Sequence, residues 1–134
     1  VTNIDTEEVR QVISTETASK VKSMMQSVVE DGTGWRGGVT GYTVGGKTGT
    51  SEPRAGREDI DGYVATYVAI SPVENTKIVL LVILKNPKGS LHNGGQIAAP
   101  TAGKMFAEIL PYMGIESGNK VNETNNNLSE SDLY

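Results

Sequence analysis

The sequence predicts an α+β fold with an antiparallel sheet of about three strands, and three observations support this prediction. Apolar residues repeat at helical spacing in two segments, one around residue 20 and one around residue 105. Between them lie β-branched runs separated by turn residues. These runs follow one another with no helix between them, which favours antiparallel pairing. We therefore expect one amphipathic helix before the sheet in the sequence and one after it.

The composition is that of a soluble globular domain. The 134 residues are 37% hydrophobic and 21% charged, and this length suits one domain with its own core. The net charge of −4 and the scattered Lys and Arg residues argue against nucleic acid as a partner. Absence of cysteine excludes thiol catalysis and thiolate metal sites. We assign no cofactor and no metal.

The first part of the chain predicts a short strand followed by a helix. Residues 9–13 form a β-branched run. Ser14 offers a hydroxyl to cap the following helix, and Gly32 and Gly34 are expected to end it in a left-handed conformation. The apolar stripe of this helix recurs every three or four residues and consists of Ala18, Val21, Met25, Val28 and Val29.

The central part predicts a glycine-rich loop over residues 32–46 and then the sheet. Residues 63–70 and 77–85 read as two strands joined by a turn at Ser71-Pro72. The core of the second strand, IVLLVIL, is apolar at both parities, so we expect it to be covered on both faces. Two helices can hardly cover both faces and both edges of three strands, so additional chain is expected to complete the fold.

The last part predicts a second helix and a polar tail. The helix is expected near Ile97, with Pro100 in its first turn and with Pro111 and Gly114 at its end. Residues 116–134 are rich in Asn, Ser and Glu and are expected to form a disordered tail or linker. Residues 1–115 are thus assigned to one domain. The buried stripe of the second helix is predicted to be Ala102, Met105, Phe106, Ile109 and Leu110.

The stretch GYTVGGKTGT, residues 41–50, matches two different motifs. Read from Gly41 it satisfies GxxxxGK[ST], the phosphate-binding loop of nucleotide hydrolases. That loop requires a helix starting at the Lys-Thr pair, but Gly49 and Pro53 follow and disfavour a helix. Nucleotide binding therefore remains an alternative, although the sequence does not predict the helix that it requires.

Read from Lys47, the same letters give Lys-Thr-Gly-Thr, the third motif of penicillin-recognising serine enzymes. In such a site Lys47 places a positive charge beside the catalytic hydroxyls. The hydroxyls of Thr48 and Thr50 bind a substrate carboxylate, and the Thr50 amide points at a developing oxyanion. Gly49 leaves the strand face bare. This reading assigns catalytic roles to Lys47 and Thr50, and substrate binding to Thr48, Gly49 and Thr50.

Several stretches together resemble the C-terminal half of the transpeptidase domain of class B penicillin-binding proteins. GGKTGTSEP is the most specific of them, and the others support it by their order and spacing over about residues 9–115. The supporting stretches are VISTETASKVKSMMQSVVEDGTG, YVATYVAISP, IVLLVILKNPKG and GGQIAAPTAGKMFAEILPYMGI.

The resemblance implies a penicillin-binding protein/β-lactamase-like fold and acyl transfer by a serine. The implied substrate is the D-Ala-D-Ala end of a peptidoglycan stem peptide, which β-lactams mimic. It implies an extracytoplasmic enzyme held at the cell membrane by an N-terminal anchor, which these residues do not contain. The strand resembling IVLLVIL is implied to pair with a strand from the N-terminal remainder of the domain.

Two further motifs of the family, SxxK and SxN, are absent from their expected positions upstream of Lys47. Ser19 and Lys22 match SxxK by letters but fall within the first predicted helix. Ser117 and Asn119 match SxN but lie in the polar tail. We therefore expect a fragment that lacks the nucleophile and is inactive alone.

Three other features admit simpler interpretations. His92, the only histidine, is expected to be a surface loop residue. Trp35 either borders a substrate groove or packs within a hairpin. Glu58, Asp59 and Asp61 are expected to form a solvated acidic turn, because their spacing is not that of a calcium loop.

Other functions stay open at the level of sequence. A D,D-carboxypeptidase, a β-lactamase or a β-lactam sensor uses a similar Lys-Thr-Gly strand, although GTSEP and the AAP helix favour the transpeptidase. A non-catalytic module that binds peptidoglycan without a covalent adduct is a third class.

Overall fold

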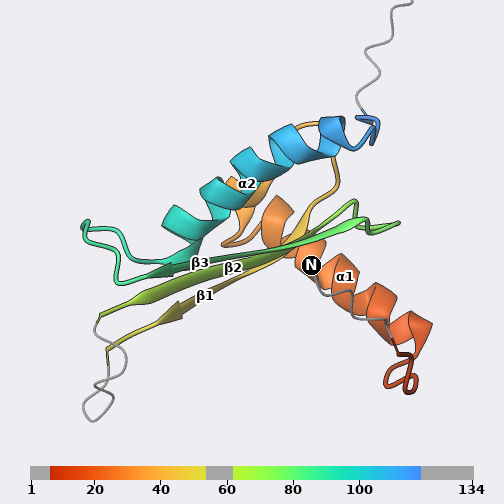
Figure 1. Ribbon diagram of the computed structural model, residues 1–134, viewed down its shortest axis with the longest axis horizontal. Coiled ribbons are helices and arrows are strands. Elements are labelled where there is room, and N and C mark those ends of the chain that lie inside the picture. The colour runs from red at the N-terminus through yellow and green to blue at the C-terminus, as the bar shows by residue number, and fades with distance from the viewer. Residues whose placement is uncertain (1–6, 54–61, 119–134) are drawn as a thin grey trace, which may run out of the picture.

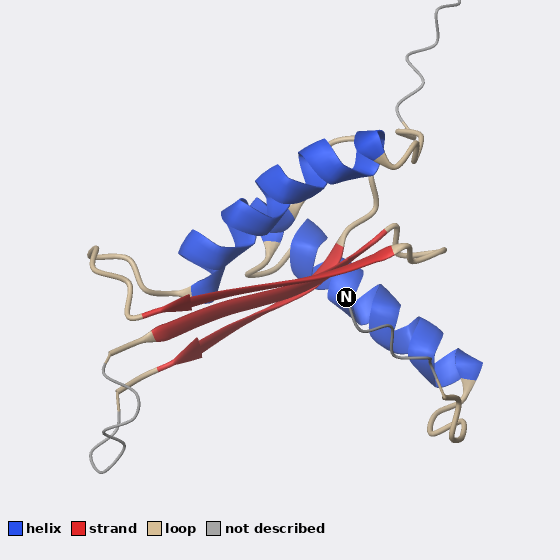
Figure 2. Cartoon of the chain, viewed as in Figure 1, coloured by secondary structure: helices blue, strands red, loops and turns tan. Residues whose placement is uncertain are grey.

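A computed structural model describes residues 7–53 and 62–118 and has the predicted α+β architecture (Figures 1 and 2). A three-residue 3₁₀ turn, η1, connects the first helix to the sheet. The elements in chain order are α1 (Thr15–Glu30), η1 (Trp35–Gly37), β1 (Gly45–Ser51), β2 (Val64–Ser71), β3 (Ile78–Lys85) and α2 (Gly94–Tyr112).

The three strands form one antiparallel sheet in the order β1-β2-β3. Thr48 of β1 lies opposite Tyr67 of β2, which lies opposite Val82 of β3. Directly opposite residues present their side chains on the same face. Figure 1 shows α2 running along this face and α1 at one end of the sheet. The core therefore forms between α2 and one sheet face, and its most buried large side chains are Tyr67, Phe106 and Leu110.

The prediction that both faces of β3 would be covered is wrong for one face within the described residues. Val79, Leu81 and Ile83 alternate with core residues and are 69%, 57% and 49% exposed. The physical reason is that α2 packs on one face only, and no described element packs over these three side chains. Burial of valine, leucine and isoleucine side chains normally stabilises a folded protein. This face is therefore an exposed apolar surface that a further segment could cover.

At the N-terminal end, the predicted strand over residues 9–13 is wrong. These residues belong to no helix or strand, and Val9 and Val12 are 82% and 75% exposed. A β-branched run forms a strand only where it finds a partner to pair with, and the described strands pair only with one another. The predicted cap is confirmed: the Thr17 amide donates to the Ser14 hydroxyl at 3.1 Å.

The apolar stripe of α1 is covered only near its C-terminal end. Val29 is buried, whereas Val21 is 47% exposed. The helix ends at Asp31 with φ −126°, and neither Gly32 nor Gly34 has a positive φ, so the predicted left-handed cap is wrong. Gly34 instead permits close packing, because a Cβ there would lie 3.3 Å from the Tyr67 ring.

The second helix begins three residues, or slightly less than one turn, earlier than predicted. It starts at Gly94, so Pro100 lies inside the helix rather than in its first turn, and Pro111 also lies within it. Met105, predicted to be buried, is 39% exposed, whereas Ala102, Phe106 and Leu110 are buried as predicted. This start was not predicted because glycine is unfavourable within a helix. A Cβ at position 94 would collide with the backbone oxygen of Thr66, so glycine is needed there for close packing.

The acidic cluster Glu58, Asp59 and Asp61 lies outside the described residues, as does Asn119. Most of the predicted tail, residues 119–134, lies outside them as well. Two hydrogen bonds hold the segment directly before residue 119. The Tyr42 hydroxyl donates to the Ile115 carbonyl at 2.9 Å, and the Gly118 amide donates to the Gly41 carbonyl at 2.7 Å. The segment after α2 is therefore hydrogen-bonded to the loop before β1 as far as residue 118.

Candidate active site at the edge strand

Residues 47–50 are extended and belong to β1, which lies at one edge of the three-stranded sheet. An edge strand has one row of backbone amides and carbonyls that do not pair within the sheet. No helix begins at Lys47-Thr48, so the geometry required for a phosphate-binding loop is absent there. The structure thus contradicts the nucleotide-binding interpretation of GYTVGGKTGT.

Thr48 and Thr50 present their hydroxyls on the face that α2 covers. The Thr48 and Thr33 hydroxyl oxygens are 3.0 Å apart. The amide of Gly94, the first residue of α2, donates to the Thr50 hydroxyl oxygen at 3.0 Å. A hydroxyl that accepts such a bond keeps its own O–H for donation. Thr50 is therefore held in place and can still donate to a ligand.

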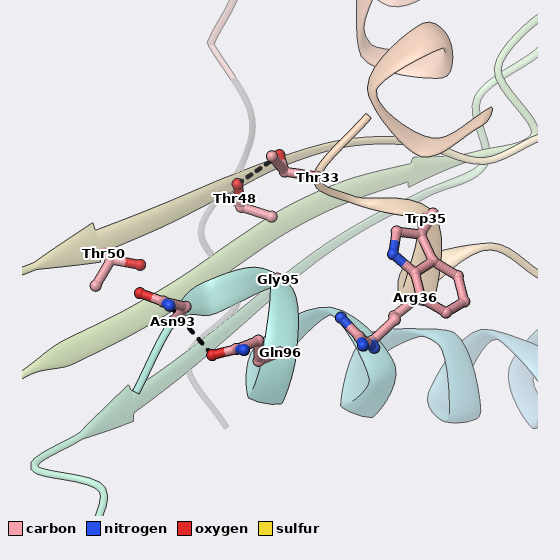
Figure 3. A pocket seen from close by; sticks show the side chains of 8 residues that line it. All are labelled: Thr33, Trp35, Arg36, Thr48, Thr50, Asn93, Gly95 and Gln96. Atoms are coloured by element: carbon pink, nitrogen blue, oxygen red, sulfur yellow. Dashed lines mark hydrogen bonds between the residues drawn. The ribbon is translucent and has the colours of Figure 1, made fainter. Parts of the chain in front are cut away.

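A cavity of about 390 Å³ lies beside these two hydroxyls. It is bounded by β1, by the start of α2 and by the segment around η1, as Figure 3 shows. Its volume falls within the range of small-molecule binding sites, about 300–1,000 Å³. Besides Thr48 and Thr50, the cavity is lined by Thr33, Trp35, Arg36, Asn93, Gly95 and Gln96.

Lys47 lies on the opposite face of β1. Side chains alternate along a strand, so Lys47 shares its face with Gly49 and with the exposed apolar residues of β3. The Lys47 side chain is exposed, and its Nζ donates to the Thr48 carbonyl at 2.8 Å. The structure therefore brings Thr48 and Thr50 together at the cavity, whereas Lys47 points to the uncovered face.

Gly49 makes room for the neighbouring strand. A Cβ at this position would collide with the Thr66 hydroxyl oxygen of β2. The backbone of Gly49 also lies close to Gly94 at the start of α2. Glycine at position 49 is thus required by packing within the sheet and against the helix. Its predicted contact with substrate stays a prediction.

Five cavity residues were not singled out from the sequence: Thr33, Arg36, Asn93, Gly95 and Gln96. They come from two segments about 60 residues apart, and only the fold brings these segments to β1. One signal was available, since Arg36 is the one cation of the glycine-rich loop directly before the motif. Trp35 lines the cavity and is 59% exposed, which agrees with the predicted border of a groove.

The remaining candidates lie away from the cavity. Ser19 is exposed on α1, and Lys22 donates from Nζ to the Glu74 carbonyl at 3.2 Å, so this pair does not form an SxxK site. His92 is half-buried and stacks on Tyr63 with 3.9 Å between ring centroids, whereas a surface residue was expected. Within residues 7–53 and 62–118, no cluster of His, Cys, Asp and Glu could hold a metal ion. None of the described helices is long and apolar enough to cross a membrane.

Comparison with known proteins assigns this arrangement to a family. The model of the penicillin binding protein transpeptidase domain matches residues 2–108. Stage V sporulation protein D of Bacillus subtilis is 36% identical over 108 residues, which are 80% of this chain and 17% of that protein. The probable peptidoglycan D,D-transpeptidase FtsI of Caulobacter vibrioides is 34% identical over 80% of this chain and 21% of its own length.

Solved structures agree with this assignment. The transpeptidase domain of penicillin-binding protein 3 from Burkholderia pseudomallei superposes with a TM-score of 0.71 and 34% identity, over 82% of this chain and 34% of that chain. The transpeptidase domain of FtsI4 from Legionella pneumophila gives a TM-score of 0.62 and 29% identity, over 73% of this chain and 37% of that chain. The chain belongs to the penicillin-binding protein transpeptidase family, as the resemblance to class B members predicted. It spans about a fifth of the length of the curated relatives named above.

Proposed function

We propose that these residues form part of a peptidoglycan D,D-transpeptidase, which cross-links stem peptides by serine acyl transfer and binds β-lactams. The observation that carries this proposal is the placement of Thr48 and Thr50 on one side of an edge strand and of Lys47 on the other. This strand can bind a substrate along its edge, with a carboxylate at the two hydroxyls and the reacting carbonyl beside the lysine.

In this mechanism, a serine oxygen attacks the carbonyl carbon of the penultimate D-Ala, and the terminal D-Ala leaves with its amine protonated. An amine of a second stem peptide then displaces the serine and forms the cross-link. Lys47 stabilises the deprotonated serine network electrostatically. The Thr50 amide donates to the oxyanion, a contact typically worth ~2.7–4 kcal/mol. Thr48 and Thr50 hold the terminal carboxylate, with Gly49 between them.

The reacting serine is proposed to belong to the N-terminal remainder of the transpeptidase domain. Lys47 shares its face with Val79, Leu81 and Ile83, which are exposed in this chain. A domain segment that covered these side chains would also bring its own residues close to Lys47. The exposed apolar surface and the exposed side chain of Lys47 thus point to the same neighbouring segment. By analogy with the relatives, we place the enzyme at the outer side of the cell membrane, with its anchor outside these residues.

Replacing Lys47 tests this function directly. We expect Lys47→Ala, in a protein that carries the complete transpeptidase domain, to lower the rate of covalent labelling by a fluorescent penicillin roughly 100-fold, because general acid–base and electrostatic contributions have this size. The measurement is the fluorescence of the protein band against time. Lys104→Ala removes a lysine from the exposed side of α2 and should label at the wild-type rate. Unchanged labelling of Lys47→Ala would refute the role given to Lys47.

A further inference from the structure

The cavity beside Thr48 and Thr50 contains a charged residue that the proposed function has not used. Arg36 lies in η1, and its Cζ is 4.5 Å from the centroid of the Trp35 ring. Contacts of an arginine with an indole face are attractive and fix the plane of the guanidinium. Figure 3 shows the guanidinium extending from η1 toward the first turns of α2. Arg36 is therefore directed along the cavity wall across from β1.

The cavity is suited to an anion. Arg36 is the one residue among its eight lining residues that carries a charge, and none of the eight is acidic. The other polar groups are hydroxyls and amides, which can donate hydrogen bonds. Gly95, in the first turn of the 19-residue helix α2, brings the positive end of the helix dipole to the same wall. The lining of the cavity thus offers an entering carboxylate one cation and two threonine hydroxyls, and no repelling charge.

We propose that Arg36 binds the C-terminal carboxylate of the stem peptide, and the corresponding carboxylate of a β-lactam, together with Thr48 and Thr50. This inference rests on the proposed function and extends it to a residue 11 positions before the motif. Arginine donates two parallel hydrogen bonds to a carboxylate in a planar fork, which lysine cannot reproduce. Arg36 therefore makes the site selective for an acid over an ester or amide of the same shape.

A purely structural role for Arg36 makes a different prediction. The Arg36 carbonyl lies against α2, where a Cβ on Gly103 would approach it to 3.0 Å, so η1 is packed through its backbone. The Arg36 side chain is exposed, and replacing it should leave the fold intact. If the side chain only supports Trp35, its loss affects all ligands equally. If it binds a carboxylate, its loss affects only ligands that carry one.

The test compares two ligands on three proteins that contain the complete transpeptidase domain. The ligands are a fluorescent penicillin with its free carboxylate and the methyl ester of the same compound. The proteins are the wild type, Arg36→Gln and Arg36→Lys, with Lys104→Gln as a control that removes one charge from the exposed side of α2. The measured quantity is the second-order rate constant of acylation, and thermal melting verifies that each variant is folded.

We expect Arg36→Gln to slow acylation by the acid about 10- to 100-fold, the range for losing a charged hydrogen bond, and to leave the ester within about twofold of wild type. Arg36→Lys should fall between the two, and Lys104→Gln should match wild type. An equal loss with acid and ester, or no loss with the acid, would overturn the role of Arg36 while the proposed function stands. Failure of the wild type to acylate with the acid would overturn the proposed function itself, and the inference with it.

Discussion

The phenol ring of Tyr67 packs so closely against η1 and β1 that two positions there must be glycine. Tyr67 is fully buried, and its hydroxyl donates to the Gly34 carbonyl at 3.4 Å. At Gly37 and Gly46 a Cβ would collide with this ring. The sequence marks both positions as glycine, but a glycine can serve a turn, a cap or a close contact. Only the structure shows that these two serve contact with one tyrosine.

Burial of this ring predicts a loss of stability at alkaline pH. Desolvation raises the pKa of Tyr67 to about 12, from 10.0 for an exposed tyrosine. The unfolded chain therefore releases this proton first, so the stabilisation is fully present below pH 10 and is lost as the pH rises toward 12. A difference of 2 pKa units corresponds to about 2.7 kcal/mol. Urea unfolding at pH 9 and above should show this decline, and Tyr67→Phe should lack it; identical pH profiles in the two proteins would contradict the assignment.

At the scale of elements, the sequence predicted type and order well and boundaries less well. Both helices, strands β2 and β3 and their antiparallel pairing follow from periodicity and turn residues. Residues 9–13 were wrongly predicted as a strand because strand propensity is expressed only where a partner strand exists. The start of α2 was missed because glycine is a poor helix former, whereas Gly94 is required there for close packing against Thr66.

The two faces of β3 give the clearest prediction for an element. In the 134-residue chain, we expect Val82→Ser to reduce the free energy of unfolding by about 1.5–3 kcal/mol, since this buried valine contacts the core. Leu81→Ser should cost less than about 0.5 kcal/mol there, because position 81 is 57% exposed. Urea unfolding measures both.

In a protein with the complete transpeptidase domain, the Leu81→Ser cost should rise to match that of Val82→Ser. An equal and small cost of Leu81→Ser in both proteins would mean that no domain segment covers this face.

At the scale of the whole molecule, the two faces of the sheet carry different residues of the Lys-Thr-Gly-Thr motif. One face carries Thr48 and Thr50 and is covered by α2. The other carries Lys47 and is covered by α1 only at the end near Gly45, so that Val79, Leu81 and Ile83 stay exposed. The motif Lys-Thr-Gly-Thr was readable from the sequence because its residues are contiguous. The cavity was not, because Thr33, Arg36 and Asn93 reach β1 only through the packing of η1 and α2.

Locating the acylated serine tests the central claim most directly. A protein containing the complete domain is treated with penicillin, digested and analysed by mass spectrometry, and the 134-residue chain is treated in parallel. We predict one penicilloyl adduct on a serine outside residues 1–134, and no adduct on the 134-residue chain. An adduct on Ser19 or on any other serine of these residues, or no adduct on either protein, would contradict the account.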